Sequence, residues 1–148
     1  MQISDILAPE RVQCDISTNS KKASLEILAN LIAGSDPGLT KVDVFNSLLS
    51  RERLGSTGLG KGVALPHGRL KHCGKAVGAF ISLATPVDYD AIDGKPVSLL
   101  FALLVPEDST QEHLDLLARL AEIFSDNKML DQLKSEQSHE KVFTLLTS

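Results

Sequence analysis

The sequence is poor in aromatic residues and in cysteine. It has no tryptophan, one tyrosine and two cysteines, and aromatic residues make up 4% of its 148 residues. A core must therefore be built from aliphatic side chains, and a hydrophobic content of 43% is ample for this. The length and composition predict one compact domain covering residues 1–148. The two cysteines, Cys14 and Cys73, permit one disulfide, but a domain of this size does not require it.

Long runs of one residue type are also absent. The longest basic run is the pair Lys21-Lys22, so no basic stripe is available to neutralise the phosphates of a nucleic acid. The apolar run at residues 99–105 is far too short to span a membrane. The N-terminus lacks the basic start and apolar stretch of a signal peptide. We therefore expect a cytoplasmic protein with reduced thiols that neither binds nucleic acid nor inserts into a membrane.

The elements that are present alternate between strand and helix signals, which predicts an α/β domain. Ser20 and Thr40 are suitable N-caps, Gly34 is a stop, and Ser109 with Glu112 forms a capping box. Nearly continuous hydrophobicity in two strands indicates a sheet covered by helices on both faces. We expect helices at residues 20–33, 40–53, 109–124, 127–134 and 138–146, strands at 11–16, 76–84 and 96–105, a flexible glycine-rich loop at 55–62, a short extended piece at 63–67, and turns at 85–95.

His67 is the strongest single candidate for chemistry. It follows the glycine-rich loop and Pro66, and Pro66 cannot donate to a sheet ladder, so His67 should lie at a sheet edge or a strand end. Small neighbours leave room for another molecule to approach the ring. Neutral imidazole is a nucleophile near neutral pH, because its ordinary pKa is roughly 6.5. From these features alone, a functional histidine and an exposed loop histidine without a role are equally supported.

Other polar residues have two interpretations each. His113 would lie on the first turn of a helix, where an anion is favoured, although a surface histidine is the more common finding. Arg51 and Arg53 could bind phosphate in a forked geometry or simply complement a helix C-terminus. Arg69, just after His67, has the same two interpretations.

Several familiar sites are excluded by spacing. His72 and Cys73 are adjacent and have no second pair at a spacing typical of zinc, so we expect no metal site there. His139 is interpreted as a solvated surface residue. The glycine-rich loop fits neither the Walker A motif nor the dinucleotide fingerprint, and Ser56 is not in a nucleophile elbow.

Residues 54–68, with the sequence LGSTGLGKGVALPHG, resemble the active-site segment of the enzyme IIA proteins of the bacterial phosphotransferase system. The resemblance is to the fructose/mannitol class and, within it, to the nitrogen-regulatory IIA proteins. Residues 86–106 resemble the central hairpin of the same family, and the likeness continues through residues 112–114. Almost the whole chain is covered. Lys61 is a departure, because a polar residue such as asparagine is expected there.

The resemblance implies a mixed β-sheet flanked by helices and a protein that transfers phosphoryl groups. His67 would correspond to the phosphorylated histidine, His113 to a second active-site histidine, and Arg51 to an active-site arginine. The glycine-rich loop would contact phosphate or partner through Ser56, Thr57, Gly58, Gly60 and Gly62. Leu59 and Leu65 would contribute to a docking patch. No metal or other cofactor is expected.

An HPr-like phosphocarrier protein would be the phosphoryl donor, and by the same resemblance the regulated partners would include potassium transport or sensor proteins. Two alternatives stay open. The first is a sugar-specific IIA component that passes phosphate to a IIB transporter domain; the lack of a linker at either end favours the regulatory protein instead. The second is a binding module that has kept the fold and lost the transfer, which the presence of His67, His113 and Arg51 disfavours.

Overall fold

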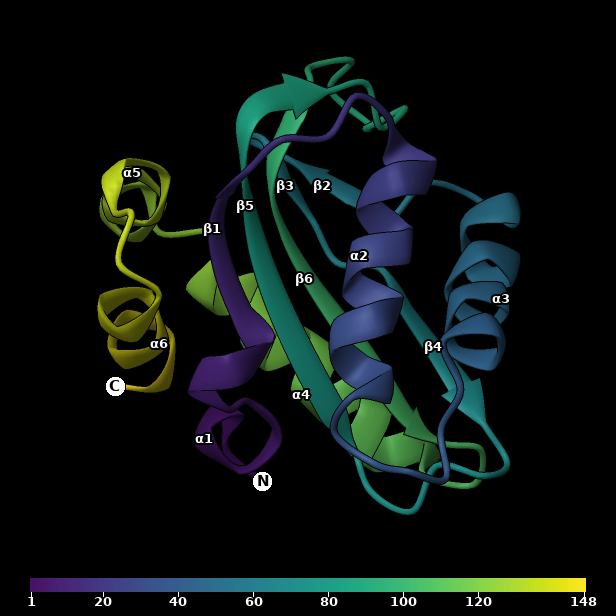
Figure 1. Ribbon diagram of the computed structural model, residues 1–148. Coiled ribbons are helices and arrows are strands. Elements are labelled where there is room, and N and C mark those ends of the chain that lie inside the picture. Colours follow the sequence, from purple (N-terminus) through teal and green to yellow (C-terminus); the bar gives the residue numbers. More distant parts are fainter.

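A six-stranded mixed sheet forms the centre of the computed structural model, which describes residues 1–148 (Figure 1). The strand order is β1-β5-β6-β3-β2, and β4 also pairs with β6. β5 and β6 are antiparallel, β1 runs parallel to β5, β3 and β4 run parallel to β6, and β2 is antiparallel to β3. The strands are β1 (Val12–Ile16), β2 (Gly58–Gly60), β3 (Val63–Ala64), β4 (His67–Leu70), β5 (Val77–Val87) and β6 (Val97–Pro106).

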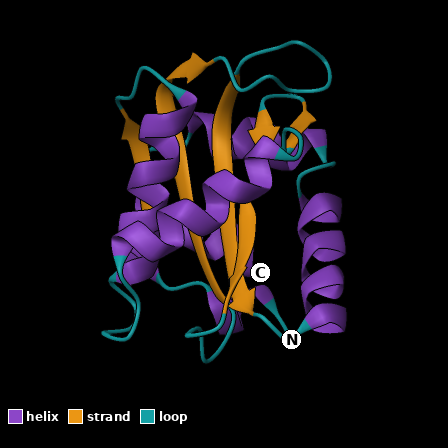
Figure 2. Ribbon diagram, turned by 90° about the vertical axis from the view of Figure 1, so that its right-hand side faces the viewer, coloured by secondary structure: helices purple, strands orange, loops and turns teal.

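Helices cover both faces of this sheet, as the sequence predicted. α2 and α3 pack on one face, and α1, α4, α5 and α6 on the other (Figures 1 and 2). Because each helix has an apolar stripe, the sheet separates two hydrophobic clusters of 20 and 19 buried residues. The helices are α1 (Ile3–Ile6), the 3-10 turn η1 (Pro9–Arg11), α2 (Lys21–Ala33), α3 (Lys41–Arg53), α4 (Thr110–Ile123), α5 (Asn127–Ser135) and α6 (His139–Thr147).

Two of the three expected N-caps are confirmed. The hydroxyls of Ser20 and Thr40 accept hydrogen bonds from the backbone N–H groups three residues later, at 3.0 and 3.1 Å. Ser138 caps α6 in the same way, at 3.4 Å, although the sequence did not single it out as a cap. The capping box predicted for Ser109 and Glu112 is wrong. Ser109 has φ −89° and ψ 60°, and its side chain makes no capping bond, although α4 still begins at the next residue.

Two stretches are more ordered than the sequence indicated. β5 continues to Val87, which is buried and pairs with Val97, so the turn expected from residue 85 begins later. The predicted flexible loop at 55–62 contains β2, which pairs with β3. Lys61, with φ 60°, and Gly62, with φ 80°, make the tight turn between these strands. The sequence shows the glycines of this hairpin, but it does not show that Gly58–Gly60 forms a strand paired with Val63–Ala64.

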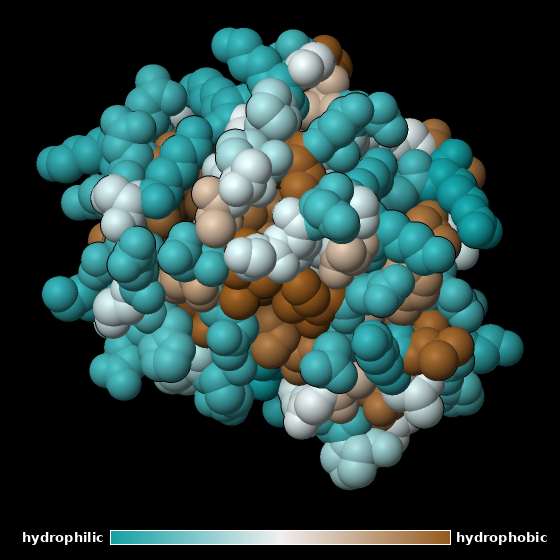
Figure 3. Space-filling view, turned by 45° about the horizontal axis from the view of Figure 1, so that its top comes forward, coloured by the Kyte–Doolittle hydropathy of each residue, from teal (hydrophilic) through white to brown (hydrophobic).

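The surface of the molecule is mostly hydrophilic, because most apolar side chains are buried. Figure 3 shows hydrophilic atoms over most of the surface in view, with apolar atoms gathered in a hollow near its centre. Both cysteines are free, as composition allowed; Cys73 is buried and Cys14 half-buried. None of the helices is long and apolar enough to cross a membrane.

Candidate active site

The first residue of β4 is His67, so the prediction that it lies at a strand end is confirmed. It pairs in register with Leu103 of β6, and the carbonyl of Pro66 accepts the N–H of Leu103 at 3.0 Å. Gly68 follows, and a Cβ at this position would lie 2.2 Å from Oγ of Ser47 on α3. Glycine is therefore needed for β4 to lie directly against α3, beside the histidine.

One nitrogen of the His67 ring is held by the backbone. Nδ1 lies 2.7 Å from the carbonyl oxygen of Leu65. A carbonyl oxygen only accepts hydrogen bonds, so Nδ1 carries the proton and Nε2 has a free lone pair. This hydrogen bond leaves Nε2 as the ring nitrogen with a lone pair available for nucleophilic attack.

His113 faces His67 from the other side of the site. It belongs to α4, is only 5% exposed, and its ring centroid lies 5.2 Å from that of His67, with the ring planes 72° apart. The alternative of a surface histidine is therefore wrong. Nε of Arg69 donates to Nδ1 of His113 at 3.0 Å, and Nε2 of His113 is buried without a hydrogen-bond partner.

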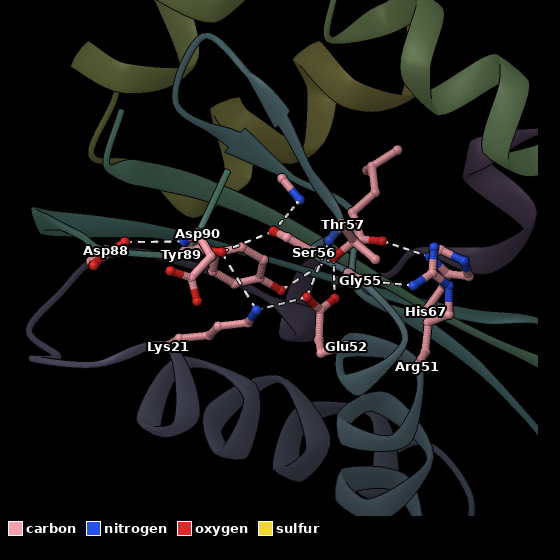
Figure 4. A network of polar contacts seen from close by, with 12 residues as sticks. Lys21, Arg51, Glu52, Gly55, Ser56, Thr57, His67, Asp88, Tyr89 and Asp90 are labelled. Atoms are coloured by element: carbon pink, nitrogen blue, oxygen red, sulfur yellow. Dashed lines mark hydrogen bonds and ion pairs between the residues drawn. The ribbon is translucent and has the colours of Figure 1, made fainter. Parts of the chain in front are cut away.

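Arg51, in the last turn of α3, lines the same depression as the two histidines and Arg69. This depression has a volume of about 670 Å³. Nη1 of Arg51 donates to the carbonyl of Gly55 at 2.9 Å, which leaves its other N–H groups available (Figure 4). A larger depression of about 830 Å³ lies between β1 and α2, and no histidine lines it. Arg53 lines neither depression.

Burial and nearby cations keep both histidines neutral. Burial lowers the pKa of His67, and the positive charges of Arg51 and Arg69 lower it further, against the opposing effect of the bond to Leu65. For His113, burial is the largest cause, followed by His67 and Arg69, and its pKa falls to about 4. Near neutral pH, one ring can therefore act as a nucleophile and the other as an uncharged hydrogen-bond donor.

Within the glycine-rich loop, Ser56 and Thr57 point inward, whereas Leu59 and Lys61 are exposed. The hydroxyl of Ser56 donates to the carbonyl of Tyr89 at 2.9 Å, and that of Thr57 bonds to the carboxylate of Glu52 (Figure 4). A Cβ on Gly58 would lie 2.7 Å from that of Ala91. Gly60 and Gly62 have positive φ, which the turn requires. None of residues 55–62 lines the depression around His67, and the hydroxyls of Ser56 and Thr57 face protein groups.

A buried polar network below this loop was missed from the sequence. Glu52, 6% exposed, accepts the N–H of Thr57 at 3.1 Å and forms an ion pair with Lys21 at 3.0 Å. The ammonium of Lys21 also lies 4.4 Å from the centre of the Tyr89 ring. Figure 4 shows Glu52 between Lys21 and Thr57, with Tyr89 alongside. These residues come from three separate segments, so only the tertiary fold reveals them.

For Arg69 the sequence leaves two interpretations open, and the structure places it in the depression with His67. The signal that could have found it is strand periodicity, since residues two apart on a strand point to the same face. Among metal-binding side chains, no group of three or more histidine, cysteine, aspartate or glutamate residues is arranged to hold an ion. His72 and His139 are both exposed and line none of the site.

Comparison with known proteins gives one consistent result. Residues 5–148 match the family model described as phosphoenolpyruvate-dependent sugar phosphotransferase system, EIIA 2. A nitrogen regulatory protein of Klebsiella oxytoca is 43% identical over 99% of this chain and 91% of its own length. The crystal structure of nitrogen regulatory protein IIA-Ntr from Neisseria meningitidis is 46% identical, covers 98% of this chain and 99% of its own, and has a TM-score of 0.92.

The crystal structure of IIA mannitol from Escherichia coli shares the fold at lower similarity. It is 20% identical, covers 95% of this chain and 98% of its own, and has a TM-score of 0.79. The mixed sheet between two helical layers is therefore the architecture of these IIA proteins.

Proposed function

The chain belongs to the EIIA 2 family of the phosphoenolpyruvate-dependent sugar phosphotransferase system, and from this premise we propose that it is a regulatory phosphoryl carrier that accepts its phosphoryl group on Nε2 of His67. The observation that carries the proposal is the hydrogen bond from Nδ1 of His67 to the carbonyl of Leu65. This bond leaves Nε2 unprotonated in a depression shared with Arg51 and His113. The donor is a phosphohistidine of an HPr-like phosphocarrier protein.

The transfer itself requires positioning more than covalent help from the protein. The lone pair on Nε2 of His67 forms a new N–P bond as the N–P bond of the donor phosphohistidine breaks. The electron pair of the broken bond stays on the donor imidazole. Nδ1 of His67 keeps its proton and its bond to Leu65 throughout, so no proton has to leave the site. The positive charge that develops on the His67 ring is stabilised by that carbonyl.

Two groups are placed to stabilise the three phosphoryl oxygens. Arg51 has N–H groups beyond the one that it donates to Gly55, and Nε2 of His113 is a buried atom without a partner. Both are positioned before the phosphoryl group arrives, which is the arrangement that stabilises developing charge most effectively.

The docking surface around His67 is partly apolar. Leu54, Leu59 and Leu114 are 83%, 44% and 53% exposed. Leu65, expected in this patch, is only 4% exposed and belongs to the core, so that expectation is corrected. Leu54 and Leu114 line the same depression as His67 and suit a partner with an apolar patch around its own histidine.

Regulation follows from the change in charge. A phosphoryl group on His67 adds negative charge at a partly apolar surface, so a partner that docks there distinguishes the two states. The likeness to nitrogen regulatory proteins supports a regulatory role. By the family resemblance, potassium transport or sensor proteins are the classes of partner to test first.

The alternative is a sugar-specific IIA component that passes its phosphoryl group to a IIB transporter domain. Its chemistry at His67 is the same, and only the recipient differs. The higher identity to the nitrogen regulatory relatives, 43% and 46% against 20% for IIA mannitol, favours the regulatory carrier. Rapid and complete transfer from the phosphorylated protein to a sugar-specific IIB domain would favour the alternative.

The direct test is intact-mass measurement after incubation with phosphoenolpyruvate and the phosphocarrier system. The wild-type protein should gain one acid-labile phosphoryl mass, and His67→Ala should gain none. His139→Ala, which removes an exposed histidine from α6, is the matched control and should behave like wild type. His113→Ala should slow the reaction on the order of a hundredfold without abolishing it, because it removes a donor and leaves the nucleophile. Phosphorylation of the His67→Ala protein would refute the proposal.

A further inference from the structure

Arg69 forms a side-chain pair with His113, and the transfer described above gives Arg69 no role. Nε of Arg69 lies 3.0 Å from Nδ1 of His113. Arg69 is on β4, two residues after His67, and its strand partner is Val105, just as that of His67 is Leu103. Leu103 and Val105 both belong to the cluster on the α4 side of the sheet. His67 and Arg69 therefore share the sheet face that His113 packs against.

The chemistry of this pair leaves one arrangement of protons on His113. A guanidinium only donates hydrogen bonds, so Nδ1 of His113 must accept with its lone pair. A neutral imidazole carries one proton, which then has to be on Nε2. In a doubly protonated ring, the N–H at Nδ1 of His113 would face the N–H at Nε of Arg69. Two donors cannot share a hydrogen bond, so this contact excludes the doubly protonated form.

The N–H at Nε2 of His113 has no hydrogen-bond acceptor within the protein. Nε2 is buried and lacks a hydrogen-bond partner. A buried donor without a partner costs free energy, and its most direct explanation is a partner that arrives later. The ring of His113 is edge-to-face with that of His67 at 5.2 Å between centroids, which is close enough for a group on Nε2 of His67 to meet it.

We propose that Arg69 is a positioning residue for phosphoryl transfer: it fixes His113 in the tautomer with the proton on Nε2, so that this proton is donated to the phosphoryl group on His67. The inference rests on the proposed function, since it assigns a role in that transfer. Arg69 acts through His113 and needs no contact with the phosphoryl oxygens. His113 is then a neutral donor, and the positive charge at the site comes from arginine.

The first experiment measures the tautomer directly and needs no phosphorylation. Long-range proton–nitrogen NMR spectra of protein labelled with ¹⁵N-histidine, taken at neutral pH, distinguish the two tautomers of each ring. The wild-type protein should show His113 with the proton on Nε2 alone. Arg69→Met should show both tautomers in exchange. Arg69→Lys, which keeps a donor, should restore the single form, and Lys71→Met, which removes an exposed cation two residues along, should not change it.

The second experiment measures the phosphorylation rate at saturating phosphocarrier protein. Arg69→Met should lower this rate about tenfold, the lower end of the effect of removing outer partners from metal-bound histidines. The donor concentration at half-maximal rate should stay the same, because docking is unchanged. In a His113→Ala background, Arg69→Met should have no further effect, since the residue through which it acts is gone.

Replacement of His113 by amides provides a matched pair. The amide nitrogen of glutamine reaches the place of Nε2, whereas that of asparagine reaches only the place of Nδ1. His113→Gln should therefore keep more of the phosphorylation rate than His113→Asn.

Three results would overturn the inference. The first is a single unchanged tautomer in Arg69→Met. The second is an unchanged rate in a variant whose tautomer has become mixed. The third is a full additional rate loss from Arg69→Met in the His113→Ala background, which would mean that Arg69 acts on its own. If wild-type His67 is never phosphorylated, the proposed function fails, and the NMR result still decides whether Arg69 sets the tautomer.

Discussion

His67 and His113 are the same residue type in contact, yet their neighbours give them opposite proton arrangements. The carbonyl of Leu65 places the proton of His67 on Nδ1, and the guanidinium of Arg69 places that of His113 on Nε2. One ring therefore presents a lone pair, and the other presents an N–H. One hydrogen-bond partner for each ring therefore sets its role. An acceptor next to His67 leaves a nucleophilic nitrogen, and a donor next to His113 leaves an N–H that can stabilise charge.

The low pKa of His113 predicts a loss of stability in acid. Its pKa is about 4 in the folded protein and roughly 6.5 when unfolded. Between these values the unfolded chain binds more protons, so the free energy of unfolding should fall as pH falls from about 6.5 toward 4. The contribution of this residue is at most about 3 kcal/mol. His67, whose pKa is also lowered, acts in the same direction.

Urea unfolding of the wild type and of His113→Gln, at neutral pH and near pH 5, measures this contribution. The wild-type protein should lose more stability between the two conditions than the variant, because glutamine does not titrate. Equal losses in the two proteins would show that His113 does not have its lowered pKa.

At the scale of elements, one buried carboxylate joins the end of α3 to the loop that leads into β2. Glu52 holds the backbone N–H and the hydroxyl of Thr57. The carbonyl of Thr57 in turn accepts the N–H of Leu65 at 3.0 Å, and the carbonyl of Leu65 holds His67. Arg51 precedes Glu52 directly. The nucleophile and the arginine are therefore positioned by the same short segment of backbone.

Close packing of this segment makes Gly58 sensitive to substitution. In Gly58→Ala the new methyl would lie 2.7 Å from Cβ and 2.9 Å from Cα of Ala91. We expect a loss of about 1–3 kcal/mol in the free energy of unfolding, the usual cost of overpacking. Gly74→Ala, where nothing lies within 4 Å of the added Cβ, is the matched control and should be close to neutral.

The double variant Gly58→Ala/Ala91→Gly removes one of the two clashing contacts and should recover part of the loss. Urea unfolding of the wild type, Gly58→Ala, Ala91→Gly and the double variant measures these effects. If the loss in the double variant equals the sum of the losses in the two single variants, the contact with Ala91 is not the cause.

Local sequence signals predicted the elements well, because caps and hydrophobic periodicity act over a few residues. Ser20 and Thr40 begin their helices as expected. The failures are of another kind. The strand at Gly58–Gly60 pairs with the adjacent Val63–Ala64 and was not recognised because it is short and rich in glycine. The Glu52 network joins segments distant in sequence, and the buried position of His113 depends on how α4 meets β4. No local pattern contains that information.

At the scale of the whole molecule, the site lies where the two helical layers meet. Arg51 comes from α3 on one face of the sheet and His113 from α4 on the other, and β4 carries His67 and Arg69 against both. The site therefore depends on both hydrophobic clusters, but only on the helices beside it. α5 and α6 stabilise the fold without contributing any residue to the depression around His67.

This arrangement predicts that stability and activity can be separated. Leu133→Ala in α5 and Leu48→Ala in α3 each remove a side chain that is 0% exposed, and each should cost about 3 kcal/mol. Only Leu48→Ala should also slow phosphorylation, because α3 carries Arg51. Unfolding free energies and phosphorylation rates, measured where both variants stay folded, provide the comparison. An equal slowing in Leu133→Ala would contradict the prediction.

The scarcity of aromatic residues gives the protein a spectroscopic property of its own. Tyr89 is the single tyrosine, and the chain has no tryptophan whose fluorescence would mask that of tyrosine. Its ring is 0% exposed and touches the network beneath the glycine-rich loop, so all tyrosine emission from the protein originates within that network. Burial raises the pKa of its hydroxyl, so in alkali the absorbance of tyrosinate should appear only when the chain unfolds. The emission and absorbance of Tyr89 therefore report on the buried network of Glu52 and Thr57.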